Sequence, residues 1–274
     1  MKKNSTKKNT RRKKAAPKKS RADAGAAETG RKGALIRKIF IFMAAAAVIA
    51  GIYGVVDYYT GWGDAGKVIE RKIKQAEESA VYKNYSKAAR IYEDILEKWG
   101  GAEEYSGAMW QVKLNLAGAY KDSGEYISAI KLYRELAEKY RNVNPDMYAW
   151  VMLELGDAYN RIYNTGDAVK VYGEITERFE GTDWAAEALF GLAETHKTAG
   201  NNKEAVKFYD IIIKKYRKGF LAAEAMTSKA EIYEKKGMYD RALEIYSKVI
   251  NDFPEIVTEY ARYRHGVLSD KKTK

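Results

Sequence analysis

Few residues of this sequence have a type and spacing that could support catalysis or metal binding. The two histidines, His196 and His265, are far apart, and no Cys or carboxylate lies at a metal-ligand spacing beside either. Carboxylate pairs such as Glu77-Glu78 and Glu103-Glu104 are spaced as solvated helix faces are, so no acid–base pair can be nominated. The sequence has no cysteine, which excludes disulfides, thiolate metal sites and cysteine nucleophiles. We therefore expect a non-enzymatic protein without metal or cofactor.

A weak phosphate-loop signal occurs at Gly61 to Lys67, GWGDAGK, which fits the spacing G-x-x-x-x-G-K. Val68 replaces the hydroxyl residue that would hold magnesium, and an apolar run rather than a β-strand precedes the segment. We interpret residues 57–66 as a flexible hinge that contains Gly61, Gly63 and Gly66.

The positive charge is concentrated at the N-terminus. The chain of 274 residues carries a net charge of +12, but residues 1–38 hold 15 Lys and Arg against two acids, a net of +13. The remaining residues carry 34 basic and 35 acidic side chains, a net of −1. Because residues 1–33 also lack large aliphatic side chains after Met1, we expect 1–38 to be a disordered basic tail.

An uncharged run of 18 residues, Ile39 to Val56, follows the tail. As a helix it would extend about 27 Å, close to the thickness of a bilayer core. Tyr58, Tyr59 and Trp62 follow where an interfacial aromatic belt would lie. A cleaved signal peptide and a buried core helix are the alternatives, but the long charged leader and the absence of neighbouring apolar helices favour a retained membrane span.

The charge asymmetry also predicts the topology. By the positive-inside rule the tail lies in the cytoplasm and the rest of the chain outside it, as in a single-pass protein of the bacterial cytoplasmic membrane. The tail could also contact anionic lipid. The alternative hypothesis is that the basic segment Arg11 to Lys14 binds nucleic acid, although no aromatic residue is interleaved to stack on bases. Ala46, Ala50 and Gly54 form a small-residue stripe that predicts self-association of the span.

From about Lys67 onward the sequence repeats itself. In the clearest unit Leu155-Gly156 is followed by Tyr159, Ala168 and Tyr172, and neighbouring units keep this spacing. The recurring alanines are Ala88, Ala129, Ala168, Ala205 and Ala242, separated by 41, 39, 37 and 37 residues. Small residues at these positions let two helices approach closely, while the aromatic residues fill the space between hairpins. His196 stands in the position of Tyr159, so we expect it to pack.

This order of residues resembles the tetratricopeptide repeat (TPR) family, and Pro254, twelve residues after Ala242, fits the pattern. The resemblance covers most of residues 67–254. It implies an all-α fold, an α-solenoid of about five helical hairpins, and a protein that holds other proteins rather than catalysing a reaction.

The sequence departs from the usual 34-residue repeat. Extra residues fall between hairpins at Arg141 to Pro145, Glu180 to Asp183 and Lys218 to Gly219. Longer-period arrays of this kind look like those of bacterial envelope proteins, in agreement with the predicted topology. In the turns within hairpins we expect a positive φ at Gly124, Gly200 and Gly237. Residues 255–274 read as a capping helix and tail, with the helix at Ile256 to His265 and with Tyr260 and Tyr263 packed inward.

The resemblance also implies a binding groove, because the first helix of each TPR hairpin lines the concave surface. Projecting the helix period gives Gln111, Leu114, Lys121, Trp150, Leu153, Asp157, Arg161, Glu187, Phe190, Glu194, Glu224, Glu231 and Glu234. Five of the last six are acidic, so the C-terminal half should prefer a basic or amine-bearing segment, with Trp150, Leu153 and Phe190 as apolar anchors. The alternative is that these glutamates only solvate an exposed helix face.

Overall fold

The computed structural model describes residues 63–216, 219–254 and 258–272, and in these ranges the chain is all helical. The helices are α2 (Gly63–Val81), α3 (Tyr85–Trp99), the short η1 (Glu103–Tyr105), α4 (Ser106–Ser123), α5 (Tyr126–Tyr140), α6 (Pro145–Arg161), α7 (Thr165–Arg178), α8 (Asp183–Thr198), α9 (Asn202–Lys215), α10 (Phe220–Lys235), α11 (Tyr239–Asp252) and α12 (Thr258–Lys272). The predicted tail at 1–38 and span at 39–56 lie outside the described residues.

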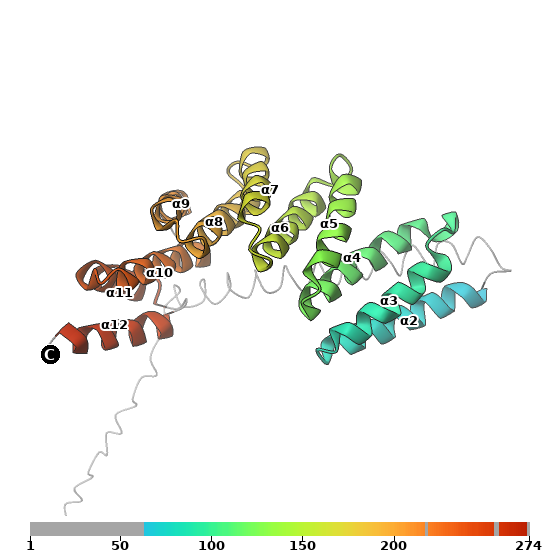
Figure 1. Cartoon of the computed structure of the whole chain (residues 1–274), viewed down its shortest axis with the longest axis horizontal. Coiled ribbons are helices and arrows are strands. Elements are labelled where there is room, and N and C mark those ends of the chain that lie inside the picture. Colours follow the sequence, from blue (N-terminus) through green and yellow to red (C-terminus); the bar gives the residue numbers. More distant parts are fainter. Residues whose placement is uncertain (1–62, 217–218, 255–257, 273–274) are drawn as a thin grey trace, which may run out of the picture.

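The helices pack as consecutive antiparallel hairpins, α2–α3, α4–α5, α6–α7, α8–α9 and α10–α11, and α12 closes the array. They follow one another in chain order along the long axis of the molecule (Figure 1). Each helix packs mainly on its neighbours in sequence, as in a solenoid. The predicted all-α solenoid of about five hairpins is therefore confirmed. None of the helices in the described ranges is long and apolar enough to cross a bilayer.

The first helix starts earlier than the sequence predicted. Gly63 and Gly66 belong to α2, and Gly66 is buried, so they are not part of a flexible hinge. Ile69, Ile73 and Ala76 bury one face of α2. This amphipathic pattern continues back into the glycine-containing segment and extends the helix.

One contact recurs in every hairpin. The five repeated alanines from Ala88 to Ala242 are all 0% exposed, and the tyrosine four residues after each of them is at most 5% exposed. These tyrosines are Tyr92, Tyr133, Tyr172, Tyr209 and Tyr246. Because each lies on a second helix and fills the space toward the first helices, the row determines how closely successive hairpins stack. The predicted packing roles of the small and aromatic positions are confirmed.

Tyr172 packs directly against two glycines of the first helices. A Cβ atom added to Gly156 of α6 would stand 2.6 Å from the Tyr172 ring, and one added to Gly191 of α8 would stand 2.5 Å from it. Neither distance is tolerable, so the ring is held between two helix backbones that only glycine can provide. Glycine within a helix costs about 1 kcal/mol relative to alanine, and here that cost is offset by the close approach.

The turns within hairpins agree with the prediction from the sequence only in part. Gly124, Gly200 and Gly237 have φ values of 87°, 79° and 73°, as predicted. Lys83 and Tyr163 adopt φ values of 59° and 58° in the other two turns. The same turn is therefore made without glycine, at a cost in backbone strain that the sequence pattern did not reveal.

The extra residues between hairpins, and the residues directly beside them, make contacts one repeat apart. Arg178 Nη2 donates to the Arg141 carbonyl at 2.5 Å, and Trp184 Nε1 donates to Asp146 Oδ1 at 3.0 Å. In the next step the Tyr216 hydroxyl donates to the Thr182 carbonyl at 3.3 Å. The longer repeat therefore adds a bonded edge to the solenoid rather than loose loops.

The end of the array differs from the prediction. Helix α12 runs from Thr258 to Lys272, and its buried residues are Ala261 and Leu268. Tyr260 and Tyr263 are 44% and 64% exposed, so the expectation that they pack inward was wrong. The register of the helix decides this, because residues one and two positions from Ala261 necessarily lie on other faces.

Replacing Gly191 tests the role of the Tyr172 contact. Gly191→Ala should lower the free energy of unfolding by about 1–3 kcal/mol because of overpacking, although alanine favours helix. Gly173→Ala in α7 is the matched control, since a Cβ atom there meets nothing within 4 Å. That change should raise stability by about 0.5–1 kcal/mol. Denaturant unfolding followed by circular dichroism measures both, and equal shifts would contradict the assigned contact.

Candidate functional site

The residues predicted to line a groove lie on the first helices of the hairpins. We call this surface the first-helix face and define it by the predicted residues of α4, α6, α8 and α10 together with the side chains that join these helices. Most of the predicted residues are half-buried, and Arg161 and Glu187 are exposed. Leu114 is buried in the core and offers a partner almost no surface. That the remaining residues bind a partner stays a prediction.

A row of polar contacts joins each first helix to the next along this face. Lys121 of α4 pairs with Glu154 of α6, and its Nζ lies 3.9 Å from Asp157. From α8, Thr195 Oγ1 donates to Asn160 Oδ1 of α6 at 2.8 Å. These two junctions use residues at equivalent positions, because Lys121 and Asn160 each follow the aromatic residue of the repeat pattern, Tyr120 and Tyr159.

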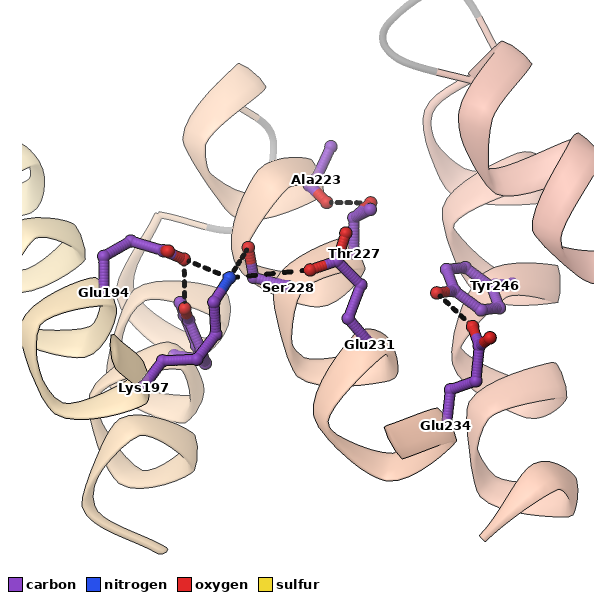
Figure 2. Close-up of polar contacts among 9 residues, drawn as sticks. Glu194, Lys197, Ala223, Thr227, Ser228, Glu231, Glu234 and Tyr246 are labelled. Carbon is purple, nitrogen blue, oxygen red and sulfur yellow. Dashed lines mark hydrogen bonds and ion pairs between the residues drawn. The ribbon is translucent and has the colours of Figure 1, made fainter. Parts of the chain in front are cut away.

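The row continues at the next junction through Lys197, which follows His196. Its Nζ lies 2.9 Å from Glu194 Oε1 in the same helix and 3.5 Å from both Ser228 Oγ and Glu231 Oε2 of α10. Figure 2 shows the lysine between its own helix and α10, with Glu194 on one side and the α10 residues on the other. One cation therefore serves two of the predicted groove glutamates.

Glu234, which follows Tyr233, makes the last step of the row. Arg264 of α12 binds it with two nitrogens, and the Nε–Oε2 distance is 3.2 Å. Glu234 Oε2 also accepts from the Tyr246 hydroxyl at 3.2 Å (Figure 2). Its side chain is only 16% exposed. Glu234 therefore holds α12 in place and is largely inaccessible to a partner.

Buried tyrosines hold the carboxylates of this face from below. The Tyr209 hydroxyl donates to Glu194, and burial together with the Glu194 charge raises the pKa of Tyr209. Burial and the nearby Glu154 charge likewise raise the pKa of Tyr133. Both hydroxyls therefore stay protonated at neutral pH. Tyr209 uses its proton to bind Glu194, whereas the buried Tyr133 hydroxyl has no hydrogen-bond partner among the described residues.

The predicted apolar anchors rest on the same tyrosines. Trp150 meets Tyr133 edge to face with ring centroids 6.5 Å apart, and Phe190 meets Tyr209 at 5.9 Å. Leu153 packs at the border of the same core. Since all three side chains are only partly buried, each presents an apolar edge beside the polar row.

Ion pairing lowers the negative charge of the C-terminal half, but does not remove it. The predicted glutamates are Glu187, Glu194, Glu224, Glu231 and Glu234, and the structure adds Lys197, Lys235 and Arg264 to the same region. Counted over α8 and α10, six acidic and three basic side chains leave a formal net charge of −3. That this half prefers a basic segment stays a prediction, which the ion pairs weaken.

A pocket of about 350 Å³ lies where α10 meets α12, lined by Glu231, Glu234, Lys235, Tyr260 and Arg264.

Within the described ranges, no cluster of three or more His, Asp or Glu side chains could hold a metal ion. His196 stacks on Phe208, with ring centroids 5.6 Å apart, in the packing role that its repeat position predicted.

The sequence did not reveal the side chains that bond across the first-helix face. These side chains are Lys197, Ser228 and Arg264. A signal existed, since the residue directly after the repeat aromatic is polar in four successive units: Lys121, Asn160, Lys197 and Glu234. Their partners one repeat later could be identified only in the folded chain.

Comparisons with known proteins agree with this geometry. Residues 187–219 and 224–255 match one tetratricopeptide repeat family model, and residues 112–146 match another. Comparison with curated protein sequences gives no match.

Solved structures show the same fold at low sequence identity. The TPR-like repeats of a kinesin light chain from Podosopora anserina align with a TM-score of 0.55 and 15% identity, covering 66% of this chain and 92% of that one. BtubC from P. vanneervenii aligns with a TM-score of 0.54 and 16% identity, covering 75% and 84%. A tetratricopeptide repeat protein from Parabacteroides merdae gives 0.52 and 16%, covering 81% and 92%. The chain therefore carries tetratricopeptide repeats arranged as an α-solenoid.

Proposed function

We propose that this protein is a non-enzymatic scaffold, anchored in the cytoplasmic membrane, that binds a partner protein on the first-helix face. TPR solenoids generally serve as surfaces for protein–protein interaction. The observation that supports this face most directly is its composition. Partly exposed Trp150, Leu153 and Phe190 lie beside a polar row whose geometry is set by interhelical bonds, so anchors and charges are preorganised.

The partner segment that fits the C-terminal half is basic or amine-bearing. The formal net charge of −3 on α8 and α10 attracts cations, and tyrosine and lysine side chains hold Glu194 and Glu231 in place. A basic partner group would therefore meet oriented acceptors without ordering them first. Envelope assembly, secretion and chaperoning are the processes in which a scaffold outside the cytoplasm would work.

Membrane anchoring rests on the sequence of residues 39–56 and on the position of α2. Only six residues, 57–62, separate the apolar run from Gly63, the first residue of α2. Such a connection reaches at most about 20 Å. The first hairpin would then lie close to the membrane surface, with the later hairpins extending from it.

The proposed orientation predicts a protection pattern. Protease added to intact spheroplasts should digest residues 63–272 and spare the N-terminal tail, because the positive charges hold the tail in the cytoplasm. Immunoblotting with antibodies against each end measures the outcome, and permeabilised cells are the control in which both ends are cut. Survival of the repeats with loss of the tail would refute the orientation.

Removing the aromatic anchors tests the binding face. Trp150→Ala combined with Phe190→Ala should lower capture of the main partner at least tenfold, if each side chain contributes about 1–2 kcal/mol. Quantitative affinity capture with the full chain gives the measurement. Tyr82→Ala is the control, since Tyr82 is 84% exposed in the turn after α2 and away from this face. Equal capture by the double variant and the control would place binding elsewhere.

The charge preference calls for a separate test with Glu187→Gln and Glu224→Gln, which spare the glutamates bonded to Lys197 and Arg264. Capture should weaken roughly threefold at low ionic strength and little at high salt, because exposed charges are screened. Glu138→Gln with Glu244→Gln, on exposed positions of the second helices α5 and α11, is the control because it changes the net charge by the same amount. A salt-independent effect would argue against electrostatic attraction.

A further inference from the structure

The first-helix face continues onto α12, which has the register of another first helix. Ala261 and Leu268 are buried in α12 as Ala225 and Ile232 are in α10, each 36 residues earlier. The polar row also continues onto α12, where Arg264 bonds to Glu234 of the preceding first helix as Ser228 and Glu231 bond to Lys197.

This register places Tyr260 and Val267 of α12 at groove positions, and exposed Tyr263 lies between them. Tyr260, Tyr263 and Val267 correspond to Glu224, Thr227 and Glu231 of α10, two of which belong to the predicted groove. Their exposed fractions are 44%, 64% and 38%. Since they stand at spacings of three and four residues, they form one stripe along the helix. The groove therefore changes from acidic to apolar at its last step.

Aromatic and aliphatic side chains that gather on one exposed face of a helix mark an interaction surface, whereas a solvated face is polar. The stripe also adjoins a cavity, because Tyr260 lines the pocket of about 350 Å³ with Glu231 and Glu234. Carboxylates and an apolar surface thus meet within the reach of one peptide.

We propose that the Tyr260–Tyr263–Val267 stripe is the apolar end of the partner groove, and that the partner segment carries basic residues next to an apolar or aromatic residue. This inference rests on the proposed function of the first-helix face. The basic residues lie along α8 and α10, where the net charge is negative, and the apolar residue docks on α12. Continuity of the face and complementary charge identify this occupant.

Two other occupants fit the stripe less well. A second copy of the chain would need roughly 800 Å² of surface on each partner, far more than three side chains provide. An anionic lipid surface would meet the net negative charge of α8 and α10, which carry six acidic side chains against three basic ones. A peptide segment is small enough and has the required sign of charge.

The test uses the purified full chain and two fluorescent peptides, one lysine-rich segment ending in Leu-Phe and the same segment ending in Ser-Ser. Fluorescence anisotropy should show about tenfold tighter binding of the Leu-Phe peptide. Tyr263→Ser with Val267→Ser should abolish this difference and leave the Kd of the Ser-Ser peptide unchanged. Tyr163→Ser is the matched control, because Tyr163 is 79% exposed in a turn away from the stripe.

A second variant keeps the test independent of the stability of α12. Val267→Glu restores the acidic residue found at Glu231, so it should tighten binding of the Ser-Ser peptide and remove the advantage of Leu-Phe. Circular dichroism shows whether each variant retains its helices.

The outcomes separate the two proposals. Binding of both peptides with equal affinity, unchanged in the stripe variants, overturns this inference and leaves the acidic groove standing. Failure of both peptides to bind overturns the basic-segment preference and this inference together. Light scattering that shows a dimer converted to a monomer by the stripe variants would assign the stripe to self-association, which also overturns the proposal.

Discussion

The contact between a buried tyrosine of each second helix and small residues of the first helices sets the geometry of this protein. Tyr133, Tyr209 and Tyr246 are 0% exposed, so their rings act as fixed spacers between hairpins. The Tyr172 ring lies between the backbones of Gly156 and Gly191, with no room for a Cβ atom at either. Because a solenoid is stabilised only by neighbouring units, a change at one spacer alters the local stacking and, through it, the direction of every later hairpin.

The same tyrosines connect packing to the chemistry of the surface. Their hydroxyls reach the first-helix face, where Tyr209 donates to Glu194 and Tyr246 donates to Glu234. Lys197 and Arg264 then join these carboxylates to neighbouring helices. The polar row therefore joins neighbouring helices whether or not a partner is bound. A partner that binds there meets charges already oriented and partly neutralised, which favours selectivity for position and sign over large electrostatic affinity.

Low identity to the solved TPR structures limits what can be transferred, since 15–16% identity shows the fold alone. What distinguishes this chain is its own set of additions to the fold. Bonds such as Arg178 to Arg141 and Trp184 to Asp146 stiffen the edge built from the extra residues. A second addition is α12, which covers the core with Ala261 and Leu268 and leaves tyrosines exposed on its surface.

The sequence by itself determined the helical repeats, because the alanine and tyrosine positions recur at the period of one hairpin and burial selects their types. It also indicated three of the five turns through glycine, and it located the first-helix face from helix periodicity. Only the tertiary structure showed that Leu114 is core, that Lys197 and Arg264 neutralise predicted groove glutamates, and that Tyr260 and Tyr263 face outward. These outcomes depend on which side chains of adjacent repeats meet. Periodicity gives the face of a helix on which a residue lies, whereas contacts between residues 30 or more positions apart depend on the stacking of whole hairpins.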